Sequence, residues 1–355
     1  MSRSPWEERV RTVTPYIPGE QPQEKNIIKL NTNECPYPPA PGVAALAAKL
    51  ESDKLRLYPD PATTKLSERL AQYYGLQKDQ VFVGVGSDDV LSMAFLTYFH
   101  SNEPILFPDI TYSFYEVWAS LYRIPYQTIP LTDDFHIEPT DYHRPNGGII
   151  FPNPNAPTGI ALPLTEVEKI LQWNPGVVVI VDEAYVDFGA QSARSLIESY
   201  ENLLVVGTFS KSRSLAGLRI GFAFGNAKLI KYLNDTKYSV NSYTMNIPSQ
   251  VLGVAALEDE DYFQSVLKRV MQTREETKER LQCLGFKVLD SCCNFLFATH
   301  PQLDADQLTA ALRAAKIYVR HWNKPRIEQY LRITIGTPEE MNALVDFLEK
   351  YQQNV

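Results

Sequence analysis

The sequence has few cysteines and no long hydrophobic run, and each of these absences excludes a class of protein. Only four cysteines occur in 355 residues, and none of them forms a C-x-x-C pair. We therefore expect buried, reduced thiols, with neither a disulfide framework nor a metal site. No apolar run approaches the roughly 18 residues that cross a membrane, and no apolar segment follows the charged first residues as in a secretory signal. These features predict a cytoplasmic protein without a membrane partner.

Basic residues are also fewer than acidic residues. The sequence holds 34 lysines and arginines against 42 aspartates and glutamates, which gives a net charge of −8. The phosphates of nucleic acids repel such a chain, so we expect no nucleic-acid partner. The hydrophobic fraction of 44% is that of a globular protein. The length suits one large domain with a smaller one.

Prolines are concentrated at the beginning of the chain, in residues 1–41. Proline interrupts helices and central strands, so this stretch is predicted to be extended. The apolar run at 27–30 argues against a disordered tail. We interpret residues 1–41 as an N-terminal arm that packs on another part of the protein.

From residue 42 onward, helical and strand-like segments alternate. The runs at 149–151, 177–181 and 203–206 are continuously apolar, as in strands that helices cover on both faces. A long, charged amphipathic helix is predicted over 262–282. The pattern predicts an α/β fold, with a large domain over 42–262 whose mostly parallel central sheet lies between helices. A smaller α/β domain is predicted over 263–355.

A carboxylate directly follows one of the buried strands. Asp182 stands at the end of the run 177–181, where burial of its charge is costly unless a partner compensates it. Ligands of open α/β sheets bind beyond the carboxyl ends of the strands. The protonated pyridine of pyridoxal phosphate (PLP) would be a suitable partner. The alternative is an aspartate that caps the next helix.

A lysine follows the next buried run. Lys211 stands shortly after the segment 203–206, and a lysine whose pKa is lowered by burial or nearby charge can bond covalently to an aldehyde. Arg219 comes eight residues later, and arginine binds phosphate through two parallel hydrogen bonds. The glycine-bearing turn before Ser87 opens a helix whose first N–H groups can bind the same anion.

The order of these motifs resembles the fold-type I aminotransferases over nearly the whole chain. The resemblance rests on NAPTG at 155–159, DEAY at 182–185, and SK at 210–211 followed by AGLR at 216–219. It implies PLP as the cofactor, Lys211 as the lysine that carries it, and Asp182 as the partner of the pyridine nitrogen. Tyr185 would contact the ring oxygen O3′. The other implied cofactor-binding residues are Ser87, Asp88, Ser210 and Arg219 around the phosphate, Tyr112 on the ring face, and Thr208.

One position departs from the family pattern. The family has an asparagine directly before Pro-Thr-Gly, whereas this chain has Ala156 there with Asn155 beside it. Either Asn155 makes the contact to the ring oxygen, or Tyr185 makes it alone.

The resemblance also implies a two-fold homodimer with shared active sites. Tyr58 would reach the cofactor phosphate of the neighbouring subunit. Residues 1–41 would then be an arm that packs with the small domain and with the dimer partner.

Within this family the sequence is most similar to the histidinol-phosphate aminotransferases. The similarity lies in TPY at 14–16, LNTNE at 30–34, LYPD at 57–60, VRH at 319–321 and YLRITIGT at 330–337. It implies a ping-pong exchange of L-histidinol phosphate and 2-oxoglutarate for imidazole-acetol phosphate and L-glutamate, a step of histidine biosynthesis. Arg320 and Arg332 would clamp the substrate phosphate or carboxylate, with Tyr16 and Asn33 closing over them.

Three other functions stay open on the sequence alone. One is an aminotransferase for phenylalanine or other aromatic amino acids. Another is a PLP-dependent decarboxylase that acts on threonine phosphate. The third is a non-catalytic, ligand-binding regulatory domain with the same fold.

Overall fold

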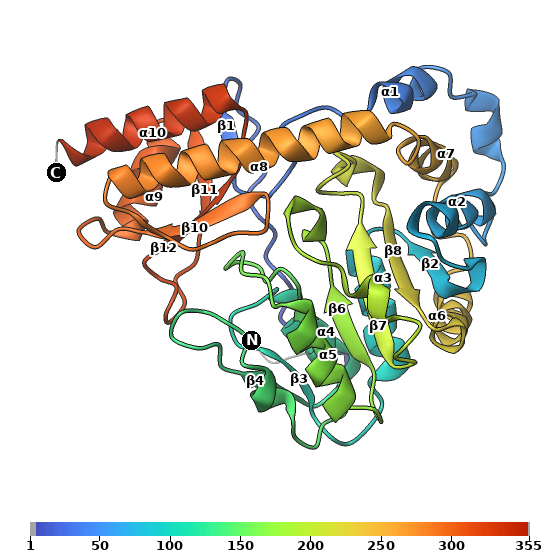
Figure 1. Ribbon diagram of the computed structural model, residues 1–355. Coiled ribbons are helices and arrows are strands. Elements are labelled where there is room, and N and C mark those ends of the chain that lie inside the picture. Colours follow the sequence, from blue (N-terminus) through green and yellow to red (C-terminus); the bar gives the residue numbers. More distant parts are fainter. Residues whose placement is uncertain (1–4, 354–355) are drawn as a thin grey trace.

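Two β-sheets organise the chain (Figure 1), and the computed structural model describes residues 5–353. The strands are β1 (Ile28–Leu30), β2 (Val81–Gly84), β3 (Ile105–Pro108), β4 (Tyr126–Ile129), β5 (Ile149–Pro152), β6 (Val179–Asp182), β7 (Leu203–Thr208), β8 (Gly221–Gly225), β9 (Lys287–Val288), β10 (Phe295–Thr299), β11 (Ile317–His321) and β12 (Tyr330–Thr334). The α-helices are α1 (Pro41–Ala47), α2 (Thr64–Tyr74), α3 (Ser87–Tyr98), α4 (Phe114–Tyr122), α5 (Leu164–Trp173), α6 (Ala227–Val240), α7 (Ile247–Ala255), α8 (Glu260–Cys283), α9 (Ala305–Ala314) and α10 (Pro338–Gln352).

The larger sheet has seven strands in the order β2-β8-β7-β6-β5-β3-β4. Every pairing in it is parallel except those of β8, which runs antiparallel to β2 and β7. The predicted α/β fold with a mostly parallel central sheet is therefore confirmed. The carboxyl ends of β6 and β7 lie at one edge of this sheet, because these strands are parallel neighbours.

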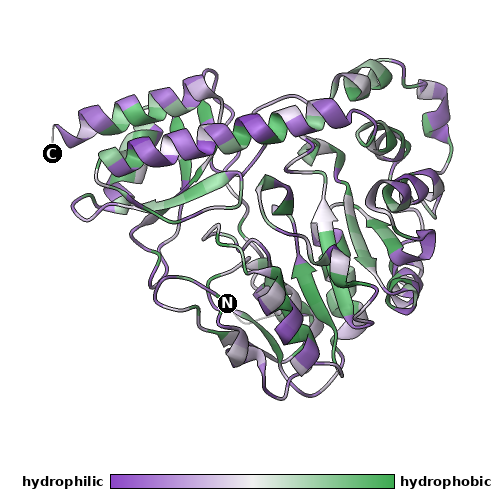
Figure 2. Cartoon of the chain, in the orientation of Figure 1, coloured by the Kyte–Doolittle hydropathy of each residue, from purple (hydrophilic) through white to green (hydrophobic). Residues whose placement is uncertain are grey.

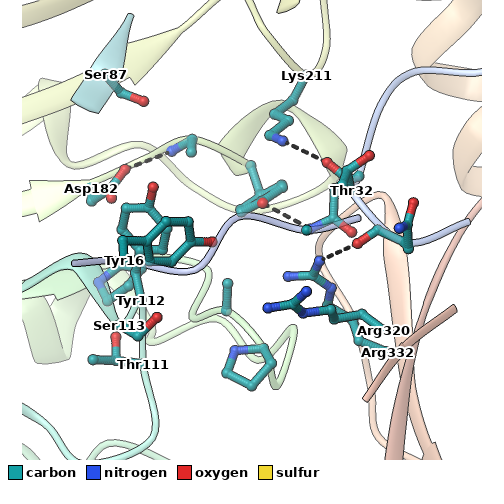
Figure 3. Close-up of a pocket in the computed structure, with 18 of the residues that line it drawn as sticks. Tyr16, Thr32, Ser87, Thr111, Tyr112, Ser113, Asp182, Lys211, Arg320 and Arg332 are labelled. Atoms are coloured by element: carbon teal, nitrogen blue, oxygen red, sulfur yellow. Dashed lines mark hydrogen bonds between the residues drawn. The ribbon is translucent and has the colours of Figure 1, made fainter. Parts of the chain in front are cut away.

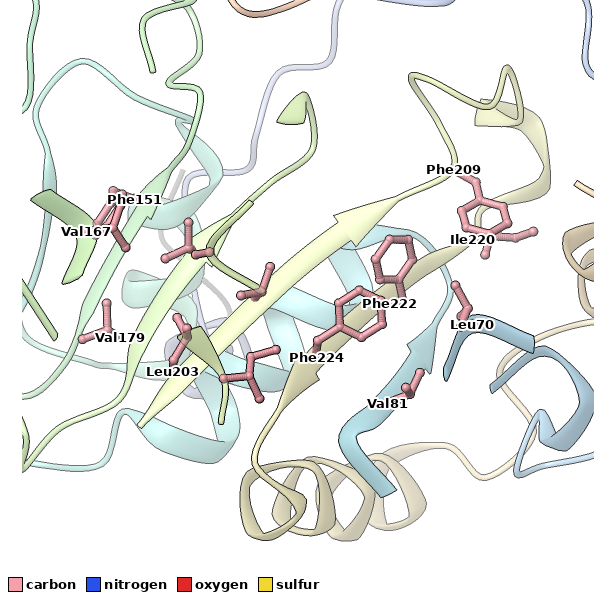
Figure 4. Close-up of a cluster of buried hydrophobic side chains, with 14 of the residues drawn as sticks. Leu70, Val81, Phe151, Val167, Val179, Leu203, Phe209, Ile220, Phe222 and Phe224 are labelled. Carbon is pink, nitrogen blue, oxygen red and sulfur yellow. The ribbon is translucent and has the colours of Figure 1, made fainter. Parts of the chain in front are cut away.

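Both faces of the large sheet are buried, as the continuously apolar runs predicted. On one face Val179 and Val181 pack with side chains from α2 and α5, and Figure 4 shows part of this cluster. On the other face Ile180 packs with residues of α3, α4 and α6. Successive side chains of a strand point to opposite faces, so a strand covered on both sides is apolar at every position. The same strands are green in Figure 2, whereas the helices that cover them carry alternating green and purple stripes.

The smaller sheet has five strands in the order β1-β11-β12-β10-β9. Its first strand, β1, comes from the proline-rich arm and pairs in parallel with β11, Ile28 opposite Ile317. Helix α8 covers this sheet with a stripe at positions 263, 266, 267 and 270, the spacing of one helix face. Phe297 and Ile327 also join the core of the large sheet, so the two units share apolar contacts.

Some sequence-based expectations need correction. Strand β6 begins at Val179 instead of 177, because the Asn202 side chain donates a hydrogen bond to the Val177 carbonyl and holds that residue outside the ladder. Cys293 is buried as expected, but Cys283, at the end of the amphipathic α8, is exposed. Helix α8 crosses the predicted limit at residue 262 without a break. The domain limits at 41 and 262 therefore stay predictions.

Within residues 5–353, no helix is both long enough and apolar enough to cross a membrane.

The close approach of β8 to the turn before α3 generates a stability prediction. A Cβ at Gly221 would lie 2.2 Å from the carbonyl carbon of Gly86 and 2.4 Å from the amide nitrogen of Ser87. Because these are backbone atoms, Gly221→Ala must shift the strand or the turn, and we expect a loss of roughly 1–3 kcal/mol in the free energy of unfolding. Urea denaturation would measure it. Gly217→Ala is the control, since a Cβ there meets nothing within 4 Å, and equal stability of the two variants would contradict this packing.

Candidate active site

A cavity of about 650 Å³ lies where the two sheets and the arm meet. This volume is typical of small-molecule sites. Figure 3 shows Ser87 and Asp182 on one side of the cavity and Arg320 and Arg332 on the other. The predicted site residues that line it are Tyr16, Asn33, Ser87, Asp88, Tyr112, Asp182, Tyr185, Thr208, Ser210, Lys211, Arg219, Arg320 and Arg332.

Lys211 extends its amine into the cavity from the loop after β7. Its Nζ donates to the backbone carbonyl of Thr32, 3.1 Å away, and lies 5.7 Å from the ring centre of Tyr185. Burial, followed by the charge of Arg332, lowers the pKa of Lys211 to about 8. The lowered pKa increases the uncharged fraction of this amine near neutral pH, and the uncharged form is the one that acts as a nucleophile or general base.

Asp182 is buried at the carboxyl end of β6. Its Oδ2 accepts a hydrogen bond from the Tyr115 hydroxyl at 2.9 Å, and its Oδ1 accepts one from the Ala184 amide at 3.2 Å. Burial raises the pKa of Asp182 to about 6, although the Tyr115 bond opposes the shift. A buried carboxylate with no cationic hydrogen-bond partner suits a ligand that brings its own positive charge.

Tyr185 is tied to the N-terminal arm. Its hydroxyl accepts a hydrogen bond from Asn33 Nδ2 at 2.9 Å. Burial raises the pKa of Tyr185 to about 12, so the hydroxyl keeps its proton and can donate to a ligand oxygen. Asn33 is in turn anchored to the small sheet. Its backbone N–H donates a hydrogen bond to Thr334 Oγ1, and the Thr334 hydroxyl donates one to Asn33 Oδ1, both at 3.0 Å.

The turn between β2 and α3 forms a small anion cradle. Gly86 has a φ of +85°, and a Cβ at this position would lie 2.5 Å from Arg219 Nη2. The α3 helix begins at Ser87, so its first N–H groups have no partners inside the helix. Arg219 Nη2 donates to Asp88 Oδ2 at 3.2 Å. Ser210 and Thr208 stand beside them, with their hydroxyl oxygens 2.9 Å apart.

Two tyrosines form an aromatic wall next to this cradle. The Tyr112 hydroxyl donates to Asp88 Oδ1 at 2.8 Å, which fixes the orientation of its ring. Tyr16, from the arm, stacks on Phe114 with ring centres 4.3 Å apart and lies 6.1 Å from the Tyr112 ring.

Arg320 and Arg332 face each other across β11 and β12, where they are directly paired residues. Arg332 Nη2 donates to the Asn31 carbonyl at 2.9 Å, whereas its Nε is buried without a partner. Burial lowers the pKa of Arg332. Among residues 5–353 no carboxylate forms an ion pair with either guanidinium. The two cations are therefore uncompensated until an anion enters.

Two predicted residues do not line the cavity of their own chain. The Asn155 side chain bonds the Ile110 carbonyl, Thr158 Oγ1 and Thr111 Oγ1 at 3.0–3.1 Å, so its polar atoms are used within the surrounding loops. Tyr58 lies on the surface with 82% of its area exposed, and its ring centre is 4.7 Å from that of Tyr243.

Sequence reasoning missed several residues that shape the site. Thr32 acts through its backbone carbonyl, which no side-chain pattern can indicate. Tyr115 holds Asp182 from the first turn of α4, whereas Tyr112 precedes that helix. Trp322 follows Arg320 by two residues, just after the end of β11, and also lines the cavity.

Arg326 was also missed. From the loop between β11 and β12 it joins the small unit to the large one, with hydrogen bonds to Asp109 Oδ2 at 3.3 Å and to the Thr132 carbonyl at 2.6 Å.

Solved structures share this fold. The histidinol-phosphate aminotransferase from Clostridium acetobutylicum superposes with a TM-score of 0.86, at 19% sequence identity, covering 93% of this chain and all of the other. The histidinol-phosphate aminotransferase from Sinorhizobium meliloti, solved in complex with pyridoxal-5′-phosphate, gives a TM-score of 0.82 at 21% identity, covering 91% of each chain. At these identities the likeness concerns the fold alone.

Sequence relatives are much closer. The chain is 54% identical over 348 residues to histidinol-phosphate aminotransferase 1 of Hydrogenovibrio crunogenus, covering 97% of this chain and 98% of the relative. It is 52% identical over 349 residues to the histidinol-phosphate aminotransferase of Lactococcus lactis subsp. cremoris, covering 98% of each. The family model described as aminotransferase class I and II matches residues 25–348. The chain therefore belongs to the class I and II aminotransferases.

Proposed function

We propose that this chain is a PLP-dependent aminotransferase that exchanges L-histidinol phosphate and 2-oxoglutarate for imidazole-acetol phosphate and L-glutamate, a reaction of histidine biosynthesis. The observation that carries the substrate assignment is the pair Arg320 and Arg332, which has no carboxylate partner among residues 5–353. A phosphate monoester dianion can neutralise both guanidinium groups at once. Relatives that share more than half of their residues with this chain carry the same activity in their names.

The residues present fit PLP. Its phosphate needs an anion cradle, and the Gly86–Ser87 turn, Ser210 and Arg219 supply one in which a Cβ at position 86 would collide with the arginine. Its pyridine nitrogen needs an anion, which the buried Asp182 supplies. Its aldehyde needs an uncharged lysine, which the lowered pKa of Lys211 supplies.

Other residues would orient the cofactor. Tyr112 would cover one face of the ring, and Tyr185 would donate to the ring oxygen without help from Asn155, whose polar atoms are already bonded. The Asp88 carboxylate already holds Arg219 and Tyr112, so only its backbone N–H would face the phosphate. Thr208 would keep its place next to Ser210.

When bound, PLP supplies an aldehyde for the substrate amine and a ring that accepts the electron pair released at the α-carbon. Lys211 Nζ acts as general base and removes the proton from that carbon. The resulting ammonium group then acts as general acid and returns a proton. Asp182, held by Tyr115, keeps its negative charge beside the ring nitrogen. Arg332 and Arg320 anchor the far end of the substrate, with Tyr16 and Asn33 closing over it and limiting the access of water.

The same cavity serves both half-reactions. Glutamate brings a single distal carboxylate, which Arg332 alone can bind. Histidinol phosphate brings a distal phosphate, which needs both arginines. The aromatic-aminotransferase alternative does not require this second cation, whereas threonine phosphate would also bring a phosphate to it. The names of the relatives favour neither of these alternatives, nor a regulatory domain.

We also propose a homodimer with shared active sites. Exposed apolar side chains accompany Tyr58, namely Leu55 and Leu57 close to it in the sequence and Tyr243 in contact with its ring. A patch of this kind is typical of a surface that a partner covers. In the dimer Tyr58 would reach the neighbour's cofactor phosphate, and the arm would pack on the partner as well as on the small sheet. We propose a cytoplasmic location, where glutamate and 2-oxoglutarate are supplied.

Reductive labelling tests the cofactor assignment. Borohydride treatment of the PLP-loaded protein should attach the cofactor to Lys211, because this amine is buried in the cavity with a lowered pKa. Peptide mass mapping would locate the label. Lys237 is the internal control, since it is also buried but its Nζ bonds the Pro61 carbonyl outside the cavity. A label on Lys237, or an unchanged label in Lys211→Ala, would refute the assignment.

A substrate panel tests the proposed reaction. L-histidinol phosphate should exceed unphosphorylated histidinol by on the order of a thousandfold in kcat/KM, because an alcohol leaves two guanidinium groups unpaired in a partly dry site. Arg320→Ala should lower this ratio and affect glutamate less. Arg280→Ala is the control, since Arg280 lies on the surface and donates a hydrogen bond to Asn342. If phenylalanine or tyrosine is the better amine donor, an aromatic aminotransferase replaces this assignment.

Subunit mixing tests the shared site. Lys211→Ala and Tyr58→Ala subunits should each be impaired alone, while a mixture should recover about a quarter of the wild-type activity, since each heterodimer holds one intact site. A mixture of two separate Lys211→Ala preparations is the control. Absence of recovery after proven subunit exchange would mean that Tyr58 does not act across the interface.

A further inference from the structure

The indole ring of Trp322 packs against both Arg320 and Arg332. It is half-buried at the beginning of the loop that connects β11 to β12, and it lines the cavity. The guanidinium carbon of Arg320 lies 5.3 Å from its ring centre, and that of Arg332 lies 5.1 Å away. One aromatic ring therefore contacts both cations that face each other across the strand pair.

This contact offsets an unfavourable arrangement. Like charges on directly paired strand residues repel each other, and Arg320 and Arg332 are such a pair. Two carboxylates that line the same cavity already have other partners, since Glu34 pairs with Lys29 and Asp109 with Arg326. The negative face of an aromatic ring attracts cations within about 6 Å, so Trp322 holds the pair together before a substrate arrives.

The two arginines depend on Trp322 to different degrees. Arg332 has two further contacts, with the Asn31 carbonyl at 2.9 Å and with the Phe295 ring at 5.3 Å. For Arg320 the structure gives neither a hydrogen bond nor an ion pair within residues 5–353, and Trp322 is its one aromatic partner there. Removal of the indole would thus release Arg320 and leave Arg332 anchored.

We propose that Trp322 is a positioning residue that holds Arg320 beside Arg332 and thereby makes the cavity selective for a phosphate monoester over a carboxylate. This inference rests on the proposed function, because it assigns the distal phosphate of that substrate to the paired arginines. Glutamate, anchored by Arg332, needs the indole less.

Steady-state kinetics on the PLP-loaded enzyme give the decisive test. Trp322→Ala should raise the KM for L-histidinol phosphate about tenfold, which corresponds to roughly 1.4 kcal/mol, with a much smaller change in kcat and in the KM for glutamate. Trp322→Phe should restore most of the lost affinity, because phenylalanine keeps an aromatic face. Trp173→Ala is the matched control, since Trp173 stacks on His143 at 5.1 Å and does not line the cavity.

Tryptophan fluorescence gives a second readout that does not depend on turnover. Titration of the PLP-loaded protein with inorganic phosphate should change the emission of the wild type and of Trp173→Phe but not that of Trp322→Phe, because an anion bound by the two arginines changes the charge next to the indole. Persistence of the change in Trp322→Phe would overturn the inference.

The kinetic outcomes separate this inference from the function on which it rests. If wild-type enzyme prefers histidinol phosphate and Trp322→Ala keeps the preference, the role of Trp322 is wrong and the proposed function stands. Equal losses for histidinol phosphate and glutamate would also overturn the role, because they indicate a structural effect. If wild type does not discriminate between histidinol phosphate and histidinol, the proposed substrate itself is wrong.

Discussion

The parallel pairing of β1 with β11 determines where the arm crosses the cavity, and the rest of the site depends on that crossing. Once Leu30 is paired with Val319, the next residues of the arm must pass between the two sheets. Each of these three arm residues then forms a hydrogen bond with one residue of the site. The Asn31 carbonyl accepts from Arg332, the Thr32 carbonyl from Lys211, and the Asn33 amide group donates to Tyr185. A short extended segment thus connects groups that the large and small units contribute separately.

Four charged groups of the cavity, Asp182, Lys211, Arg320 and Arg332, have no ion-pair partner among residues 5–353. Asp182 is buried with only hydroxyl and amide donors, and its pKa is raised to about 6. The lowered pKa of Lys211, about 8, has burial as its main cause and Arg332 as the next. A ligand that brings a cationic ring nitrogen, an aldehyde and an anionic group satisfies the carboxylate, the amine and the anion cradle together. At the far end, Arg320 and Arg332 have no carboxylate partner among residues 5–353, which is why we propose that they bind the anionic group of the substrate.

The sequence predicts the parts of this fold and site that depend on local patterns. Buried strands are apolar at every position, so β5, β6 and β7 could be located within about two residues, and the site residues that follow β6 and β7 came with them. Asp182 and Lys211 stand at the carboxyl ends of parallel neighbouring strands, and Arg219 comes just before β8, whose antiparallel pairing with β7 brings it to the same edge. Family resemblance added residues such as Tyr16 and Tyr112, which no strand pattern indicates.

Other features could not be predicted, because they depend on tertiary contacts. Thr32 contributes a backbone carbonyl, whose role is independent of its side chain. Asn155 lies one residue before the position at which the family has its asparagine. In the structure its side-chain amide donates hydrogen bonds to the Ile110 carbonyl and to Thr158 Oγ1. Trp322 gains its role only when β11 and β12 pair, since that pairing brings Arg332 over the same ring as Arg320.

In the reaction that we propose, the loaded cavity takes an amino group from a phosphate-bearing amine and retains it until a keto acid accepts it. A single-turnover experiment tests it most directly, with PLP-loaded protein mixed with L-histidinol phosphate in the absence of any keto acid. We expect release of one equivalent of imidazole-acetol phosphate per active site, no carbon dioxide, and return to the starting absorbance only when 2-oxoglutarate is added. Release of carbon dioxide, or no keto product from fully loaded protein, would contradict it.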